Sequence, residues 1–142
     1  MRGVALSCLL VLSSLVFSYA SSSPIPGEKE REIELSEAVK LHKQNVVFVD
    51  ARSREFFEEG HIKAAVSLST QDFDSSIVKF IQIYPDSTPL VLYCSGRECS
   101  DSHDLADLLY RKGYFNIRIF SDGYPAWEAA KLPIEASLSR EQ

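Results

Sequence analysis

The chain has 142 residues, of which 45% are hydrophobic and 25% charged, and its formal net charge is -5 at pH 7. This length suits one domain, and the composition is that of a soluble globular protein, which excludes a disordered or fibrous chain. Because acidic and basic residues are interspersed and no lysine or arginine block is present, we expect no nucleic-acid partner.

The first twenty residues differ from the rest of the chain. Arg2 gives one positive charge, and residues 4–17 are apolar with serine as the only polar type. Small residues at Ser18 and Ala20 are those that a signal peptidase recognises. The pattern predicts a signal peptide over 1–20 and export to the periplasm or the outside of the cell. The apolar stretch is shorter than the ~20 residues of a usual membrane span, so we expect membrane association only if the leader stays uncleaved.

Cleavage would remove Cys8 and leave Cys94 and Cys99 as the cysteines of the mature chain, in an oxidising compartment. The segment after the leader is rich in Ser, Pro, Gly and Glu and has nothing to bury, so we expect order to begin near Ile33. The predicted organisation is a signal peptide, a linker, one domain and a C-terminal tail, over residues 1–20, 21–32, 33–136 and 137–142.

Short apolar runs then alternate with helical patterns along the chain. The runs are rich in β-branched and aromatic residues, as is typical of buried parallel strands, and they cover residues 46–49, 65–68, 90–93 and 117–120. The helical patterns lie at residues 36–44, 53–59, 73–84 and 101–112. This alternation predicts an α/β fold, a parallel sheet with helices on both faces, in which sites lie beyond the carboxyl ends of the strands.

Cys94 directly follows the strand predicted at 90–93, and Ser100 is predicted to cap the next helix, so the segment between them is a strand-to-helix turn. Backbone N–H groups in such a turn favour a negative charge at its centre. A thiol placed there ionises more easily, and the same groups would hold a persulfide anion. We therefore predict that Cys94 is a nucleophile among inward-facing amides, open to a small anion; the alternative is a buried, structural cysteine. The predicted active-site loop is Ser95, Gly96, Arg97, Glu98, Cys99 and Ser100.

Several short motifs, in this order, resemble those of the rhodanese family. They are Asp50-Ala51-Arg52, Gly60-His61-Ile62, Tyr93-Cys94, Gly123-Tyr124-Pro125-Ala126-Trp127 and Leu132-Pro133-Ile134. The resemblance implies a five-stranded, mainly parallel sheet flanked by helices. It also implies a sulfurtransferase, in which Cys94 takes sulfane sulfur from thiosulfate or a similar donor as a persulfide and passes it to a thiol or to cyanide.

The loop departs from the pattern of the resembling family. Glycine is common three residues after the cysteine and arginine five residues after it, whereas Arg97 and Cys99 occupy these positions here. Arg97 either holds an anionic donor by charge-assisted hydrogen bonds or is a solvated arginine balanced by Glu98. Cys99 could attack the persulfide or close a disulfide with Cys94, which would turn a sulfur carrier into a dithiol switch.

Other residues near the predicted site have structural interpretations. We expect Asp50, Arg52 and Glu55 to form an ion-pair network that fixes a turn, because buried charges need partners. The resemblance implies that His61 is a hydrogen-bonding structural residue more than a catalytic one, and we expect Trp127 to lie in the core. No Cys/His spacing resembles a zinc site, so we expect no metal and no cofactor.

Three function hypotheses remain. The first is an exported sulfurtransferase, expected to be a monomer, with a small anionic sulfur donor and a thiol acceptor as partners. The second is a non-catalytic or redox-sensing module that cycles Cys94 and Cys99 between dithiol and disulfide and meets a redox partner. The third, a cysteine phosphatase or arsenate reductase, is disfavoured because Ser100 stands where that chemistry needs an arginine.

Overall fold

The structure is a computed structural model, and it describes residues 31–137. The predicted signal peptide with Cys8, most of the predicted linker and nearly all of the predicted tail lie outside the described residues. Within them, no helix has both the length and the apolar character that crossing a bilayer requires.

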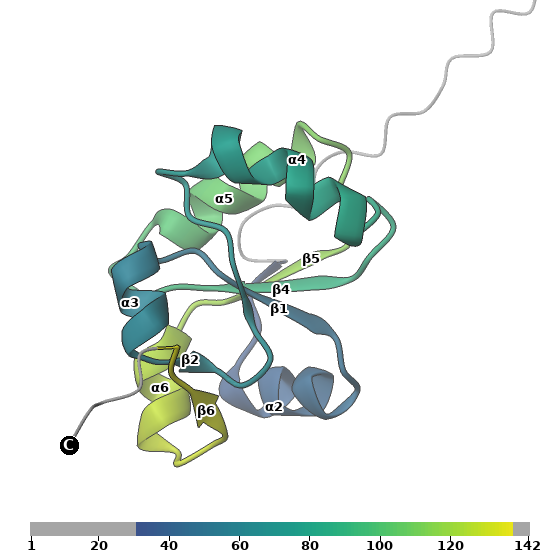
Figure 1. Cartoon of the computed structure of the whole chain (residues 1–142). Coiled ribbons are helices and arrows are strands. Elements are labelled where there is room, and N and C mark those ends of the chain that lie inside the picture. Colours follow the sequence, from purple (N-terminus) through teal and green to yellow (C-terminus); the bar gives the residue numbers. More distant parts are fainter. Residues whose placement is uncertain (1–30, 138–142) are drawn as a thin grey trace, which may run out of the picture.

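A four-stranded parallel sheet forms the centre of the domain (Figure 1). Its strands, in spatial order, are β3 (Val66–Ser67), β1 (Val47–Asp50), β4 (Leu90–Tyr93) and β5 (Ile117–Phe120). All four lie at the predicted apolar runs; β1 is shifted by one residue, and β3 is shorter than expected. The prediction of a mainly parallel α/β fold is confirmed.

The prediction of a fifth strand in this sheet is wrong for the described residues. Its place beside β5 is occupied by a single parallel bridge between Glu32 and Ile119, next to a hydrogen bond from the Ile33 N–H to the Ile119 carbonyl, 2.8 Å long. Helix α2 (Leu35–Lys43) begins only two residues after Ile33, so the chain turns away from the sheet edge before a strand can form.

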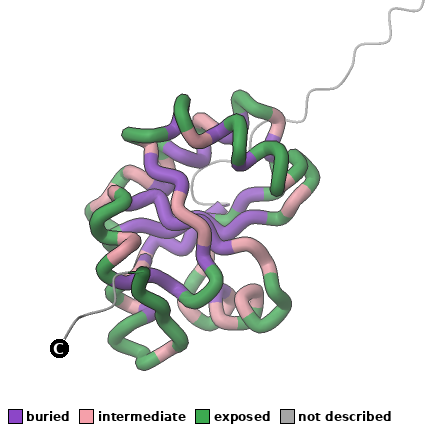
Figure 2. Tube along the Cα trace, in the orientation of Figure 1, coloured by how far each residue is buried: buried purple, intermediate pink, exposed green. Residues whose placement is uncertain are grey.

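Helices cover both faces of the sheet, as predicted. Figure 1 shows α4 (Phe73–Ile83) and α5 (Asp101–Tyr110) on one face and α2 with α6 (Gly123–Ala129) on the other. One apolar cluster joins the sheet to α4 and α5, and a second joins it to α2 and α6, with Trp127 in the second cluster as predicted. Figure 2 shows the resulting buried layer running through the strands.

Two short strands and one helix were not predicted from the sequence. Strands β2 (His61–Ile62) and β6 (Ile134–Glu135) pair antiparallel as a separate two-stranded sheet. Both are too short to show a period-2 pattern. Helix α6 begins at Gly123 and contains Pro125, two residue types that favour turns when the sequence is considered alone. The remaining helix, α3 (Arg54–Glu59), lies within a predicted helical pattern.

The domain extends beyond the boundary predicted at Ile33. Arg31 is buried, lies over the Tyr110 ring at 5.0 Å and pairs with Asp107 at 3.5 Å. At the other end, the Ser137 N–H donates to the Glu58 carbonyl. Arg31 has a long apolar stem that packs below its charged group, which is why a polar segment can be part of a packed domain.

Candidate active site

The register of the central strands brings three chain segments to one edge of the sheet. Asp50 pairs with Tyr93, and Tyr93 pairs with Phe120, so β1, β4 and β5 end at the same level. The residues that follow β4 and β5 are Cys94 and Ser121. This carboxyl edge is where parallel sheets carry their sites, and the predicted loop lies there.

The sulfur of Cys94 is enclosed by acceptors. Its side chain is 1% exposed, and the thiol donates to the carbonyl oxygens of Cys99 at 3.2 Å and of Gly96 at 3.7 Å. The hydroxyl of Ser102 lies 3.5 Å from the same sulfur. Carbonyl oxygens accept a hydrogen bond from a thiol but repel a thiolate. The expectation of an open sulfur among inward-facing amides is therefore wrong for this conformation of the loop.

The inward-facing amides point to the second cysteine instead. The backbone N–H groups of Ser95 and Asp101 hydrogen-bond to the sulfur of Cys99, which is partly exposed. The cause is the turn at Gly96, whose φ is +118° and whose carbonyl accepts from the Cys99 N–H at 3.0 Å. This turn directs carbonyls inward near Cys94 and carries Cys99 into the amide cradle.

Burial and the hydrogen bond with Cys94 raise the pKa of Cys99 to about 12, although the two backbone N–H groups lower it. An unperturbed cysteine has a pKa of about 8.5. Because the folded pKa is raised, Cys99 keeps its proton at neutral pH. The stability that this protonated form contributes is present below pH ~8.5 and is lost as the pH rises toward the folded pKa.

We expect iodoacetamide to alkylate Cys99 at least about a hundredfold more slowly near pH 8.5 in the folded protein than after denaturation, because the reagent attacks the thiolate. Peptide mapping by mass spectrometry at increasing times measures this ratio. Equal rates in the folded and denatured protein would contradict the raised pKa.

Helix α6 holds the loop by a close backbone contact. The Tyr124 N–H donates to the Cys94 carbonyl at 2.9 Å, and Gly123 has a φ of +65°. A Cβ atom added to Gly123 would lie 2.2 Å from the Cys94 oxygen and 2.7 Å from the Gly96 nitrogen. Only glycine fits at this position, because both neighbouring atoms belong to the backbone and cannot move aside.

We expect Gly123→Ala to lower the free energy of unfolding by at least about 2 kcal/mol, since it adds a backbone clash to an unfavourable φ. Gly113→Ala is the matched control: its φ is +95°, but its added Cβ would meet only the side chain of Asp86, at 3.6 Å. Urea unfolding of both variants separates the free-energy cost of the backbone clash from the cost of placing alanine at a positive φ. Equal losses in the two variants would show that the contact with Cys94 does not constrain the loop.

Arg97 pairs with carboxylates from outside the loop. Its guanidinium is exposed and donates to Asp122 at 2.6 Å, with Glu34 at 3.8 Å, and not to Glu98. The hydrogen bond and charge of Asp122 raise the pKa of Arg97. In this structure Arg97 is thus bound by carboxylates that an anionic donor would have to displace.

Asp50 and Arg52 form a buried pair below the loop. The Arg52 guanidinium donates to Asp50 at 2.6 Å and to the Gly60 carbonyl at 2.7 Å, and it lies 4.3 Å from the centre of the Tyr124 ring. Burial lowers the pKa of Arg52, but the hydrogen bond and charge of Asp50 outweigh this and raise it. Glu55, predicted to join this network, is exposed and forms no part of it.

Two further predicted residues have structural contacts. His61 is buried, is bonded through Nδ1 to the Phe57 carbonyl at 2.7 Å and stacks on the Phe57 ring. Ser100 precedes α5 as predicted, but its hydroxyl donates to the Asp104 carboxylate at 2.8 Å and caps no backbone N–H. Its helical backbone angles explain this, because a capping side chain needs an extended residue.

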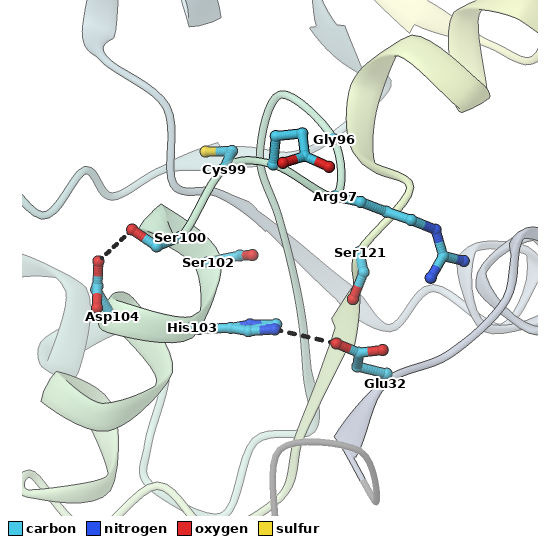
Figure 3. Close-up of a pocket in the computed structure, with 10 residues that line it drawn as sticks. Glu32, Gly96, Arg97, Cys99, Ser100, Ser102, His103, Asp104 and Ser121 are labelled. Carbon is cyan, nitrogen blue, oxygen red and sulfur yellow. Dashed lines mark hydrogen bonds and ion pairs between the residues drawn. The ribbon is translucent and has the colours of Figure 1, made fainter.

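A cavity of about 440 Å³ lies beside the loop (Figure 3). Loop and α5 residues form much of its wall, and Glu32 and Ser121 close it from the side of β5. Sequence reasoning missed Glu32, His103 and Ser121. Ser121 could have been found, because it follows a predicted strand and so lies at the carboxyl edge. Glu32 could not, because it lies in a polar segment that was predicted to be a linker. Among residues 31–137, no cluster of side chains suited to bind a metal ion is found.

Comparison with known proteins relates the chain to one family. A sequence model described as "Rhodanese-like domain" matches residues 34–130. The chain is 26% identical over 126 residues to the uncharacterized protein YibN of Escherichia coli, covering 88% of this chain and 83% of that one. It is 29% identical over 106 residues to the thiosulfate sulfurtransferase GlpE of Vibrio cholerae, covering 75% and 93%.

Two other comparisons bear on the fold and on the alternatives. The chain is 29% identical over 109 residues to the dual specificity phosphatase Cdc25 of Arabidopsis thaliana, covering 70% of this chain and 73% of that one. The crystal structure of the BH2092 protein from Bacillus halodurans superposes with a TM-score of 0.67 at 19% identity, covering 80% and 83% of the two chains. The last similarity shows a shared fold.

Proposed function

Because this chain belongs to the rhodanese-like domain family, whose sequence model covers residues 34–130, we propose that it transfers sulfane sulfur through the thiol of Cys94. The observation that carries the proposal is the position of Cys94, at the carboxyl end of the central strand β4 and at the start of the loop into α5. The similarity to GlpE, named a thiosulfate sulfurtransferase, supports a sulfurtransferase-type role.

The proposed reaction has two displacement steps. The Cys94 thiolate attacks the sulfane sulfur of a donor; the donor's S–S bond breaks, and the rest of the donor leaves with the electron pair, forming the Cys94 persulfide. A thiol or cyanide acceptor then attacks the outer sulfur, the persulfide S–S bond breaks, and the Cys94 thiolate returns. Cys99 is not the first nucleophile in this scheme, because its raised pKa keeps it a thiol.

The proposal requires the loop to open. In the conformation described, the sulfur of Cys94 is closed off and faces carbonyl oxygens, so neither donor nor persulfide anion fits there. Ser95, Arg97 and Glu98 are exposed. Gly96 lies between them, and a glycine adopts alternative backbone angles at low cost. In the proposed open state, the backbone angles at Gly96 differ, so that the loop carbonyls turn away from the Cys94 sulfur and the donor can reach it.

Intact-mass measurement tests the proposal directly. We expect protein incubated with thiosulfate, or with a small alkyl persulfide, to gain the mass of one sulfur atom, and peptide mapping to place it on Cys94. A subsequent cyanide pulse should remove it as thiocyanate. If no donor gives the adduct, sulfur transfer by this chain is refuted.

A second candidate function rests on the contact between the two cysteines. The side chains of Cys94 and Cys99 are close enough to hydrogen-bond, and both are free thiols in the structure. A redox module would lose two hydrogens and form the Cys94–Cys99 disulfide. Protein isolated without reductant would then be lighter by two hydrogens and regain them with reductant; an unchanged mass under mild oxidants would rule out this function.

The similarity to a phosphatase does not lead to a phosphatase proposal. Ser100 occupies the position at which that chemistry needs an arginine to clamp the phosphate. The loop's own guanidinium, that of Arg97, is already bound to Asp122.

We also propose that the chain is exported. The apolar stretch at residues 4–17, which no charged residue interrupts and which Arg2 precedes, supports export. A mature N-terminus at Ser21, identified by mass spectrometry of the protein from its native cell, would support cleavage; an intact Met1 would contradict it.

A further inference from the structure

Two buried polar atoms in the walls of the cavity beside the cysteine loop have no partner among residues 31–137. They are the hydroxyl of Ser121, a residue 7% exposed, and Nδ1 of His103. Buried polar groups are nearly always hydrogen-bonded, and an unsatisfied one is costly. The Ser121 hydroxyl points toward the side chains of His103 and Glu32 (Figure 3). The cavity therefore lacks a polar partner at this point.

The missing partner is a hydrogen-bond donor. His103 Nε2 lies 3.2 Å from the Glu32 carboxylate, which can only accept, so the hydrogen of a neutral imidazole is on Nε2. Nδ1 is then a bare acceptor. The Ser121 oxygen can accept as well, because a hydroxyl carries two lone pairs. An ammonium group, with three N–H donors, can satisfy both atoms, whereas a carboxylate or a sulfonate can accept only from the Ser121 hydroxyl and leaves Nδ1 without a donor.

The charges around the cavity favour the same ligand class. The carboxylates of Glu32, Glu98 and Asp104 line it, and Arg97 is its one guanidinium. Asp122 and Glu34 already pair with Arg97. Together these carboxylates attract a cation and repel an anion such as thiosulfate.

The N-terminus of α5 does not reverse this preference. A helix N-terminus attracts anions through its free N–H groups and its dipole. Here Asp101 and Asp104 lie in its first turn, and the Asp101 N–H is bonded to the sulfur of Cys99. Its positive end is thus already compensated within the chain.

We infer that this cavity binds the ammonium end of a small aminothiol or amine-bearing persulfide, so that the sulfur donor or acceptor is cationic at that end and not the small anion that the resemblance implies. The inference deepens the proposed sulfur transfer and rests on it for the role of the ligand. The binding preference itself is independent of any transfer.

A matched set of unreactive ligands tests the binding. They are 2-(methylthio)ethylamine, 2-(methylthio)ethanol and 3-(methylthio)propionate. Their polar ends are cationic, neutral and anionic, and none of them carries a transferable sulfur. We expect the amine to bind at least about tenfold more tightly than the carboxylate at low ionic strength, with chemical-shift changes at Ser121 and His103 in NMR titrations. The difference should shrink in about 1 M salt, where the Debye length is only about 3 Å.

Two variants connect that preference to the residues. Ser121→Ala and Glu32→Gln should each weaken binding of the amine several-fold and weaken binding of the uncharged alcohol less, whereas Glu55→Gln, a change at an exposed carboxylate on α3, should change nothing. Ser121→Ala removes an unpartnered hydroxyl, so no loss of folding is expected to obscure the result. Equal binding of amine and carboxylate, or tighter binding of the carboxylate, overturns the inference.

The matching persulfides separate this inference from the proposed function. Persulfides of cysteamine, 2-mercaptoethanol and 3-mercaptopropionate should load Cys94 in that order of rate. If none loads Cys94 while the amine ligand still binds preferentially, the proposed transfer fails and the cation site stands. If all load at equal rates, the transfer stands and the cation site fails.

Discussion

Replacing Cys94 with serine is expected to reduce kcat/KM for sulfur transfer at least about a thousandfold and to abolish the persulfide adduct. A serine hydroxyl is too weak a nucleophile to attack sulfane sulfur, because it is far less acidic than a thiol and its oxygen is less polarisable than sulfur. Serine is close to cysteine in size, so the variant should remain folded, although Cys94 is 1% exposed. The measurement is a steady-state assay with a persulfide donor and cyanide, combined with intact mass after a single exposure to donor.

The matched control is Cys99→Ser in the same assay. We expect it to form the adduct on Cys94, because Cys99 is a thiol and not the first nucleophile. In this variant the persulfide should persist longer, since Cys99 can no longer displace hydrosulfide from it to close the disulfide. If instead Cys99→Ser loses the adduct and Cys94→Ser keeps it, the amide-bonded sulfur of Cys99 is the carrier, and the assignment of Cys94 is wrong.

The second large effect concerns stability. Asp50→Ala should lower the free energy of unfolding by about 3 to 5 kcal/mol, because it leaves the Arg52 guanidinium buried without its carboxylate. Asp50 is 0% exposed and Arg52 is 6% exposed, so water cannot replace the lost partner without local opening. Urea unfolding monitored by the fluorescence of Trp127, which lies in the core, measures the loss.

Two further variants make this prediction specific. The double variant Asp50→Ala with Arg52→Met should recover much of the stability, since removing both charges is far less costly than removing one. Glu55→Gln should leave the free energy of unfolding unchanged within experimental error, because the side chain is exposed. A large loss of unfolding free energy in Glu55→Gln would instead support the three-residue network that was predicted from the sequence.

Strong local patterns explain which parts of the fold were predictable. The run at 90–93 is apolar on both faces and that at 117–120 is apolar except for Arg118, and they became β4 and β5 at the predicted residues. Helix α6 escaped prediction because its start is specified by a long-range fit, that of Gly123 against the Cys94 backbone, and not by its own composition. The single bridge at Glu32 likewise depends on a neighbouring strand edge.

The candidate site was predictable in position but not in orientation. The strand-end rule located the loop from Cys94 to Ser100 correctly, but the direction of its peptide groups depends on the backbone angles at Gly96. A glycine permits several such paths, so the sequence could not decide which sulfur receives the amides. Glu55 and Arg97 were assigned partners by closeness in sequence. Asp50 and Arg52 do pair, but without Glu55, and Arg97 pairs with Asp122, which is distant in sequence.

The bridge at Glu32 has a practical consequence for anyone who trims the chain. A recombinant fragment that starts at Ile33, the point at which the composition suggests that folding begins, would keep both cysteines and nearly the whole apolar interior. It would nevertheless lose the carboxylate that fixes the His103 tautomer, together with Arg31 stacked on Tyr110. Such a fragment could fold well and still misreport which small molecules the native protein accepts.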